Sequence, residues 1–286
     1  MRHRIQRIVN RFRPVKLPDF AIIGGQKCGT TSLYHMLASH PNIGMSVGAQ
    51  ETHFLDRHFH KGLDWYRAHF PFDGKTDRQG IRTSAGDCTP IYLFHPLVPE
   101  RARNTIPNAK FVVLLRDPVE RTLSHYFHCL KRGHEHLKLD DALAAEEERL
   151  SGEVQRMYDD PGYYSIPYRR FSYRKRGVYH EQIARWRDFF PEESFLFLRS
   201  DMLSSSPGEA LGRIFDFLDL PAMEPPPDTR RNVGRWSDVP EKTIEMLAQY
   251  FEEPNRHLTE VLGPDFNFNE RPGPLLRQRF GDKSSR

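Results

Sequence analysis

The chain has 286 residues, of which 38% are hydrophobic and 28% charged, and its formal net charge is +4. These values are typical of an ordinary soluble globular protein, and no apolar run approaches the ~20 residues that a membrane-spanning helix needs. The basic charge suits an anionic ligand. No zinc-finger or RNA-binding signature is present, so we expect no nucleic-acid partner.

Residues 1–17 form a basic amino-terminal arm without the continuous apolar stretch of a secretory signal. Apolar side chains recur among its arginines at helical spacing: Ile5, Ile8, Val9 and Phe12. We expect a solvated or docked arm, with contact to a membrane surface as the alternative. The chain has three cysteines and no CxxC pair, which predicts no disulfide framework and favours a reduced, cytoplasmic protein.

The first predicted strand, Phe20–Ile23, is wholly apolar and ends abruptly in two glycines. The sequence from Gly24 to Thr31 reads GGQKCGTT, and the next segment, Leu33–Leu37, has its apolar residues on one helical face. Backbone N–H groups and the positive end of the helix dipole then converge on one point. This strand, turn and helix together predict an anion-binding site.

The same loop departs from the GxxxxGK[ST] pattern of ATP-binding loops. Gly24 and Gly29 have the expected separation, but Thr30 occupies the position of the lysine, and Lys27 precedes the second glycine by two residues. The loop is therefore expected to hold an anion while presenting its cation at a different place. A plain strand-to-helix turn is the alternative interpretation.

A second predicted strand, Phe111–Leu115, ends in Arg116. Asp117 is followed by proline and, at the third helical position, by Glu120, which is the pattern of a helix amino terminus. Arg116 and Ser124, which lies two turns into that helix, are placed to bind a second phosphate-sized group. Alternatively, Arg116 pairs with a carboxylate.

The rest of the chain adds one predicted strand and three predicted helices: Phe195–Leu198, then Val178–Phe190, Leu211–Leu218 and Thr243–Leu262. Alternating strands and helices predict an α/β fold, with a P-loop-like central parallel sheet flanked by helices, in a single domain over residues 18–270. Tyr158–Arg176 has no clear period and is predicted to be a long loop. Residues 271–286 form a polar carboxy-terminal tail.

Four groups of residues, in order along the chain, resemble the motifs of sulfotransferases, most closely the heparan sulfate glucosaminyl 3-O-/N-sulfotransferase type. GGQKCGTTSLYHMLASHP from residue 24 is similar to the 5′-phosphosulfate loop and its helix, and FVVLLRDPVERTLSHY from residue 111 to the 3′-phosphate site. QETHFLD from residue 50 and GLDWY from residue 62 resemble the acceptor-side segment of the 3-O-sulfotransferases. NVGRWS from residue 232 and YFEEPN from residue 250 resemble the late cofactor loop and closing helix.

The resemblance implies a donor, 3′-phosphoadenosine 5′-phosphosulfate (PAPS), released as adenosine 3′,5′-bisphosphate (PAP), and no metal. It implies that the 5′-phosphosulfate is held by Lys27 and by the backbone of Cys28, Gly29, Thr30 and Thr31. The remaining donor residues would be Arg116 and Ser124 for the 3′-phosphate, with Gly234 and Arg235 closing over the donor. On the acceptor side it implies Glu51 as catalytic base, with His53 beside it, and we expect Asp56 and Cys88 to bind the acceptor.

Sulfuryl transfer depends on in-line placement and on stabilisation of charge more than on covalent help. Lys27 is expected to meet the negative charge that grows on the bridging oxygen of the donor. Glu51 is expected to take the proton of an acceptor hydroxyl or amine, and His53 is the rival base. We prefer Glu51, with His53 orienting the substrate; a solvated surface carboxylate is the alternative for Glu51.

The sequence also departs from the heparan sulfate enzymes. Cys88 stands where they often carry a basic residue, and their two cysteines before the late glycine-arginine pair are absent. With no membrane anchor in the sequence, we expect a soluble bacterial enzyme acting on a surface polysaccharide, a lipid-linked sugar or a small natural product. Tyr168 and Arg169 belong to an aromatic, cationic stretch that would line the acceptor cleft and favour an acidic acceptor; a solvated loop is the alternative.

Two other functions remain open: an ATP-dependent P-loop kinase, and a non-catalytic glycan- or nucleotide-binding module on the same fold. The displaced lysine and the lack of an acidic strand end that would bind Mg²⁺ argue against the kinase. The histidine pairs at 58/60, 125/128 and 134/136 match no complete set of metal ligands, so we expect them to be surface or helix-face residues.

Overall fold

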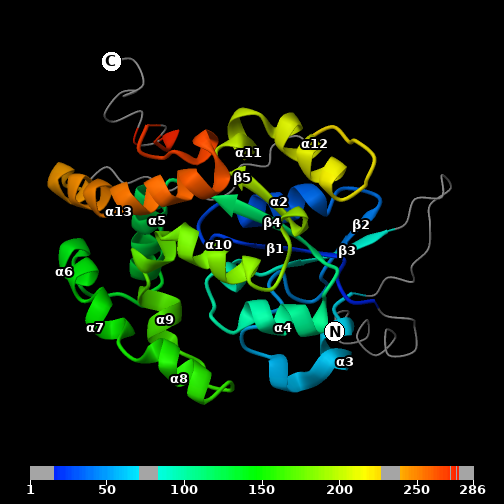
Figure 1. Ribbon diagram of the computed structural model, residues 1–286, viewed down its shortest axis with the longest axis horizontal. Helices are drawn as coiled ribbons and strands as arrows, with labels where there is room; N and C mark the ends of the chain where they lie inside the picture. Colours follow the sequence, from blue (N-terminus) through cyan, green and yellow to red (C-terminus); the bar gives the residue numbers. More distant parts are fainter. Residues whose placement is uncertain (1–15, 71–82, 227–238, 271, 275, 277–286) are drawn as a thin grey trace.

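The structure, a computed structural model, describes residues 16–70, 83–226, 239–270, 272–274 and 276. A five-stranded sheet lies at its centre (Figure 1). The strands are β1 (Phe20–Gly24), β2 (Ile43–Met45), β3 (Ser84–Cys88), β4 (Lys110–Leu115) and β5 (Phe195–Arg199). They pair in the order β2-β3-β1-β4-β5, and every pair is parallel. The predicted α/β fold with a parallel sheet is therefore confirmed.

Helices cover both faces of the sheet (Figure 1). On one face lie α2 (Thr30–Leu37), α11 (Met202–Ser205) and α12 (Pro207–Phe217). The opposite face is covered by α3 (Gly62–Arg67), α4 (Val98–Thr105) and α10 (Tyr179–Arg187), and α13 (Glu241–Leu262) packs on α10 and α5 (Pro118–Lys131). In the part of the chain described, no helix is long and apolar enough to cross a membrane.

Short helices complete the molecule. A group beside α5 consists of α6 (Leu139–Ala144), α7 (Glu146–Leu150), α8 (Glu153–Asp159) and α9 (Ile166–Phe171). Single 3₁₀ turns are η1 (Phe59–Lys61), η2 (Pro90–Leu93), η3 (Lys175–Gly177), η4 (Glu192–Ser194) and η5 (Pro264–Phe266). The basic arm predicted for residues 1–17 lies outside the described residues, except for its last two.

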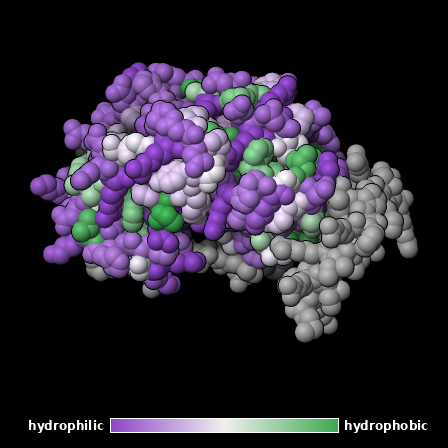
Figure 2. Space-filling view, turned by 90° about the horizontal axis from the view of Figure 1, so that it is seen from below, coloured by the Kyte–Doolittle hydropathy of each residue, from purple (hydrophilic) through white to green (hydrophobic). Residues whose placement is uncertain are grey.

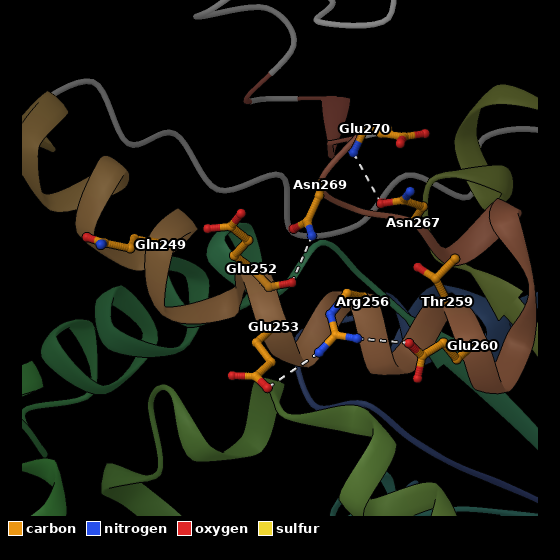
Figure 3. A pocket seen from close by; sticks show the side chains of 9 residues that line it. All are labelled: Gln249, Glu252, Glu253, Arg256, Thr259, Glu260, Asn267, Asn269 and Glu270. Carbon is orange, nitrogen blue, oxygen red and sulfur yellow. Dashed lines mark hydrogen bonds and ion pairs between the residues drawn. The ribbon is translucent and has the colours of Figure 1, made fainter.

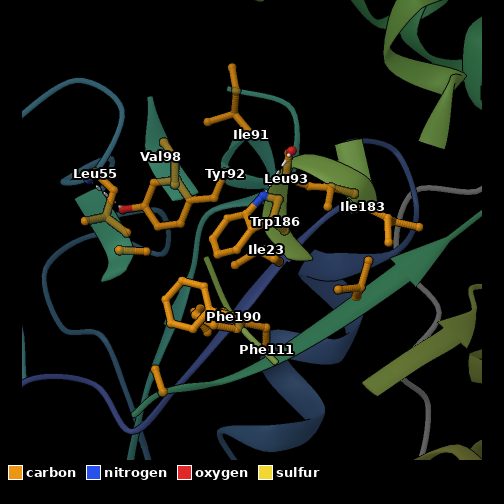
Figure 4. Packing of buried hydrophobic residues seen from close by; sticks show 14 of the residues in the cluster. Ile23, Leu55, Ile91, Tyr92, Leu93, Val98, Phe111, Ile183, Trp186 and Phe190 are labelled. Atoms are coloured by element: carbon orange, nitrogen blue, oxygen red, sulfur yellow. Dashed lines mark hydrogen bonds between the residues drawn. The ribbon is translucent and has the colours of Figure 1, made fainter. Parts of the chain in front are cut away.

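The core has two layers because successive strand residues point to opposite faces of the sheet. In β1, Ala21 and Ile23 pack towards α4 and α10, whereas Phe20 and Ile22 pack towards α2 and α12. Figure 4 shows the first layer, in which Phe111 of β4 meets Trp186 with ring centroids 4.8 Å apart. Both apolar layers end at the carboxyl ends of β1 and β4, and polar loops begin there.

Two strands, β2 and β3, were not predicted from the sequence. β3 reads SAGDC and has little of the apolar character expected of a buried strand. A side chain at Gly86 would lie 2.8 Å from Met45 Sδ and closer still to the ring of Phe20, so its neighbours fill the space that β3 leaves. Tertiary packing, which local sequence does not record, makes this segment a strand.

The prediction of one long loop over Tyr158–Arg176 is wrong. The segment contains the end of α8 and all of α9, whose amino end is capped by Ser165, with the Tyr168 N–H donating to Ser165 Oγ over 3.0 Å. Tyr168 and Arg176 are 5% and 1% exposed. The Tyr168 hydroxyl and both terminal nitrogens of Arg176 form hydrogen bonds inside the protein, so residue types that usually mark a solvated loop here belong to a packed layer.

Candidate active site

The loop from Gly24 to Thr31 joins β1 to α2 in a compact turn. The Gly25 N–H donates to the Leu114 carbonyl at 2.9 Å, and the Cys28 N–H returns to the Gly25 carbonyl at 3.1 Å. Lys27 and Gly29 both have a left-handed backbone, with φ of 71° and 88°. A lysine in this region is strained, and such strain concentrates at functional sites. Gly29 is exposed and forms the N-cap of α2, which no described side chain caps.

Lys27 lies half-buried above α5. Its Nζ is 3.4 Å from Nδ1 of His128, and among the described residues no carboxylate forms an ion pair with it. Burial, and then the positive charge of Arg116, lowers the pKa of the Lys27 ammonium. Burial and the charge of Lys27 lower the pKa of His128 to about 4, so His128 is neutral at pH 7 and accepts from Lys27. No role was predicted for His128, although it lies one helical turn after Ser124.

Arg116 connects the end of β4 with the loop. Its Nη1 donates to the Lys27 carbonyl at 3.3 Å, and its Nε and Nη2 donate to Glu120 Oε2 at 3.0 and 2.9 Å. Asp117 caps α5 as predicted, accepting from the N–H groups of Val119 and Glu120. The carboxylate pairing considered as an alternative for Arg116 is thus present, and it holds the guanidinium beside the loop.

A buried tyrosine ties these two strand ends together. Tyr179 OH donates to the Arg116 carbonyl over 2.8 Å and lies 3.8 Å from Cys28 Sγ. Burial raises the pKa of the Cys28 thiol, which is 1% exposed. The buried side chain of Cys28 therefore anchors the loop to the protein interior. Thr30 and Thr31 are the first two residues of α2, and Ser124 lies on α5. Gly234 and Arg235 lie outside the described residues.

The acceptor-side residues form a chain of ion pairs. His53 Nε2 is 3.0 Å from Glu51 Oε2, and His53 Nδ1 is 3.0 Å from Asp56 Oδ2. Burial alone lowers the pKa of His53, but the hydrogen bonds to both carboxylates outweigh it and raise the pKa to about 9. Burial raises the pKa of Asp56, yet the bond and charge of His53 bring it below its usual value. His53 is thus an imidazolium that donates from both ring nitrogens.

Asp87, which the sequence did not single out, holds this segment from behind. The carboxylate is fully buried and accepts from the hydroxyls of four residues at 2.8–3.2 Å: Thr52, Tyr66, Thr89 and Tyr92. Burial raises the pKa of Asp87 despite these four bonds. Because Thr52 lies between Glu51 and His53, the network fixes the backbone that carries both. The sequence offered no clear signal for Asp87, because β3 (SAGDC) was not recognisable as a buried strand.

The other predicted acceptor residues divide into two groups. Arg169 reaches the site, with Nη2 3.5 Å from His53 Nε2 and its guanidinium against the ring of Tyr164. Tyr168 stacks on Phe94, with ring centroids 4.3 Å apart, and its OH donates to the Phe94 carbonyl. Cys88 is 0% exposed, with Sγ 3.8 Å from the Thr30 carbonyl. A substrate contact for Tyr168 or Cys88 stays a prediction, which this burial does not favour.

The donor and acceptor residues lie close enough to interact electrostatically. The Glu51 carboxylate acts on the pKa of His128, the partner of Lys27, and on the pKa of Cys88, the partner of the Thr30 carbonyl. The sheet supports this proximity: Glu51 follows β2, β2 pairs with β3, and β3 and β4 are the two neighbours of β1. Loops leaving the carboxyl ends of adjacent parallel strands meet at one edge, where ligands of open α/β sheets bind.

A pocket of about 650 Å³ lies elsewhere, along α13 (Figure 3). Its lining is Gln249, Glu252, Glu253, Arg256, Thr259, Glu260, Asn267, Asn269 and Glu270. Arg256 already pairs with Glu253 and Glu260, so carboxylates dominate the remaining charge. An anionic nucleotide would be repelled there. Among the described residues no group of histidine, cysteine and carboxylate side chains is arranged to hold a metal.

Comparison with known proteins identifies the class. A sequence model of the sulfotransferase domain matches residues 17–253. Heparan sulfate glucosamine 3-O-sulfotransferase 3B1 of Homo sapiens is 32% identical over 207 residues, which are 72% of this chain and 47% of that protein. The chain therefore belongs to the sulfotransferase family, as the resemblance of its motifs predicted.

Two further relatives cover more of the chain. Membrane-associated sulfotransferase kil1 of Dictyostelium discoideum is 26% identical over 317 residues, 88% of this chain and 66% of that protein. The crystal structure of a sulfotransferase from Alicyclobacillus acidocaldarius is 27% identical, with a TM-score of 0.67 over 87% of this chain and 96% of that one. The chain spans about half to two thirds of the length of these curated relatives.

Proposed function

We propose that the protein transfers the sulfuryl group of PAPS to an acceptor hydroxyl or amine, with Glu51 as the base. One observation carries the proposal: the Glu51–His53–Asp56 chain lies within electrostatic reach of His128, the partner of Lys27, and Lys27 has no carboxylate partner among the described residues. Family membership supports the type of reaction. The residue roles rest on the resemblance of the motifs and, for the described residues, on this geometry.

The donor end fits a phosphosulfate in charge and shape. Exposed Gly29 permits close approach of a ligand to the backbone, and the amino end of α2 supplies N–H groups and a positive dipole. Lys27 adds a charge that is partly desolvated and therefore interacts more strongly with an anion than a surface lysine does. Arg116, with Ser124 two turns along α5, would bind the 3′-phosphate, and Gly234 and Arg235 would close over the donor.

The acceptor end favours Glu51 over His53 as the base. His53 has a pKa of about 9 and donates from both nitrogens, so near pH 7 it has no lone pair with which to take a proton. Glu51 is 40% exposed, and only its Oε2 is bonded to His53, at 3.0 Å. Its second oxygen is therefore available for an incoming hydroxyl. His53 bonds one oxygen of Glu51, and Asp56 holds His53 in place, so the two residues orient the base.

The reaction balances without a metal or redox partner. The acceptor oxygen forms a bond to sulfur while the bond from sulfur to the bridging oxygen of the donor breaks. Glu51 receives the acceptor proton, and Lys27 donates a hydrogen bond to the oxygen on which negative charge develops, so that PAP leaves. The loop and Arg116 hold the donor in line with the acceptor, which accounts for much of the acceleration.

The acceptor class follows from the groups around Glu51. The guanidinium groups of Arg57 and Arg169 lie 4.8 and 5.6 Å from the centroid of the Tyr164 ring. A ring beside two cations suits a sugar that carries an acidic group, and a relative that acts on heparan sulfate supports a glycan. Figure 2 shows a largely hydrophilic face with small, separated apolar patches. We therefore favour a polar glycan over an apolar natural product.

We also propose a cytoplasmic location. The three cysteines are free thiols and buried, which fits a reducing compartment. One relative is named as membrane-associated, so fractionation of cells that express the protein is a direct test. If the protein is recovered in the membrane pellet and high salt releases it, the result would favour the surface-bound alternative instead.

Isothermal titration calorimetry and mass spectrometry test the proposed function. We expect PAP to bind without magnesium and ATP to bind weakly with or without it; magnesium-dependent ATP binding would favour the kinase. With labelled PAPS and a panel of glycans, a product that gains one sulfate identifies the acceptor. PAP binding without transfer to any acceptor, unchanged in Glu51→Ala, would favour a non-catalytic binding module.

A further inference from the structure

The carboxy-terminal segment packs against the start of α5, although the sequence predicted only a polar tail from residue 271. The Gly273 N–H donates to Asp117 Oδ2 at 2.9 Å, and the Leu276 N–H donates to Glu120 Oε1 at 3.1 Å. Leu276 is 9% exposed and belongs to the apolar cluster that contains Val119 and Leu123 of α5. Two backbone bonds and an apolar anchor thus attach this segment to one turn of helix.

Gly273 permits this approach through its lack of a side chain. A Cβ atom at that position would lie 2.8 Å from Asp117 Cβ and closer still to the Glu120 carboxylate. Neither neighbour is the free end of a flexible side chain in solvent: Asp117 is 3% exposed and Glu120 is 0% exposed. An alanine at 273 would therefore displace the segment, the carboxylates, or both.

Glu120 connects the segment with the residue assigned to the 3′-phosphate. One carboxylate oxygen, Oε1, accepts from the tail, and the other, Oε2, accepts from Nε and Nη2 of Arg116. A buried carboxylate needs both sets of donors, because an unsatisfied oxygen in the interior costs free energy. The position of the guanidinium therefore depends on the position of the tail.

We infer that residues 272–274 and 276 are a positioning element for Arg116, and through it determine how well the protein recognises the 3′-phosphate of its donor. This inference rests on the proposed function, because it assumes that the donor carries that phosphate. The segment need not touch the nucleotide. It holds Glu120, which orients a planar guanidinium whose charge-assisted bonds to phosphate depend on direction as well as distance.

The test compares two ligands that differ by one group: PAP, and 5′-AMP, which lacks only the 3′-phosphate. Their dissociation constants are measured by calorimetry, with 5′-AMP in competition with PAP where its binding is weak. The variants are Gly273→Ala and a chain that ends at residue 270. Gly212→Ala is the matched control, because no atom lies within 4 Å of a Cβ at that helical position.

We expect Gly273→Ala and the shortened chain to bind PAP about tenfold more weakly, the loss typical of a disturbed charge-assisted bond, and to bind 5′-AMP as the wild type does. The control should change neither. Equal weakening of both ligands, or loss of folding in both variants, would assign the segment to stability alone and overturn the inference. Unchanged PAP binding would also overturn it. If the wild type itself does not bind PAP, the proposed function fails instead.

Discussion

The proposed donor and acceptor ends of the candidate site differ in whether their positive charge is paired with carboxylates of the protein. At the donor end, Lys27 and the backbone of the β1–α2 loop present positive charge without a described carboxylate opposite Lys27. At the acceptor end, the positive charge of His53 forms ion pairs with two carboxylates, those of Glu51 and Asp56. An anion that binds and leaves supplies its own counter-charge. A base that must stay fixed needs its partner within the protein.

This comparison predicts that the two ends can be changed separately, and Glu51→Gln tests that most directly. Removing the proton acceptor should lower the turnover number about 1000-fold, within the range of general-base catalysis. The dissociation constant of PAP should stay at the wild-type value. Glu193→Gln, a change at an exposed carboxylate, is the control and should alter neither. A parallel loss of PAP binding would show that the ends are not independent.

The ion pairs of His53 should appear in the pH dependence of stability. Its pKa rises from 6.5 to about 9, which corresponds to about 3 kcal/mol of folding free energy. Because the folded pKa is the higher one, this contribution is complete below pH 6.5 and is lost as the pH rises to 9. We expect the difference in unfolding free energy between wild type and His53→Gln, from urea titrations, to shrink over that window. A constant difference from pH 6 to 10 would contradict this assignment.

The network behind the base should act on stability and turnover together. Asp87→Asn keeps the shape but replaces one acceptor oxygen with a donor facing hydroxyl groups, so we expect about 2 kcal/mol less unfolding free energy. Turnover should fall because Thr52 and Glu51 lose their fixed backbone, while PAP binding changes little. Asp188→Asn, at an exposed position, serves as the control in urea unfolding and in sulfation assays.

At the donor end, a substitution of Arg121 is expected to increase stability, in contrast to the substitution of Asp87. It is fully buried, and its Nε and Nη1 have no hydrogen-bond partner within the described residues. Arg121→Met should raise the unfolding free energy by about 1 kcal/mol, because an unpaired buried charge is replaced by an apolar chain. Thr122 still donates to the Tyr173 carbonyl that Arg121 also contacts.

The same change should weaken PAP binding severalfold through the loss of positive potential beneath the loop. Arg213→Met, an exposed arginine, is the control. Calorimetry and urea unfolding on one preparation give both quantities. Lower stability, or stronger PAP binding, would show that Arg121 is a structural residue whose charge is already balanced.

The donor end could largely be predicted from the sequence, whereas the acceptor end could be predicted only in part. The β1–α2 loop and the Asp117 cap are local patterns, in which the residues that act together are neighbours in the chain. Glu51, His53 and Asp56 are also neighbours in the sequence, and they were identified from the resemblance to the family's motifs. The charge state of His53 was not predictable, because it depends on burial and on two bonds.

Residues that act across the fold escaped the sequence analysis. Asp87 collects hydroxyls from three other segments, and His128 meets Lys27 from 101 positions away. The burial of Tyr168 and Cys88 and the docking of Leu276 have the same origin. Each depends on which elements pack together, and no local pattern of residue types encodes that choice.

The order of the strands also determines when the site can form during synthesis. β1 lies at the centre of the sheet, yet its partners are β3 and β4, and Phe20 pairs with Lys110, about 90 positions later. One edge of β1 can pair with β3 once residue 88 has been made, but its other edge and the Gly25 N–H have no partner until the residues of β4 have left the ribosome. Such long-range parallel pairing is slow, and the intermediate that precedes it is prone to aggregate. We expect chains truncated before residue 115 to aggregate rather than to form a partial sheet.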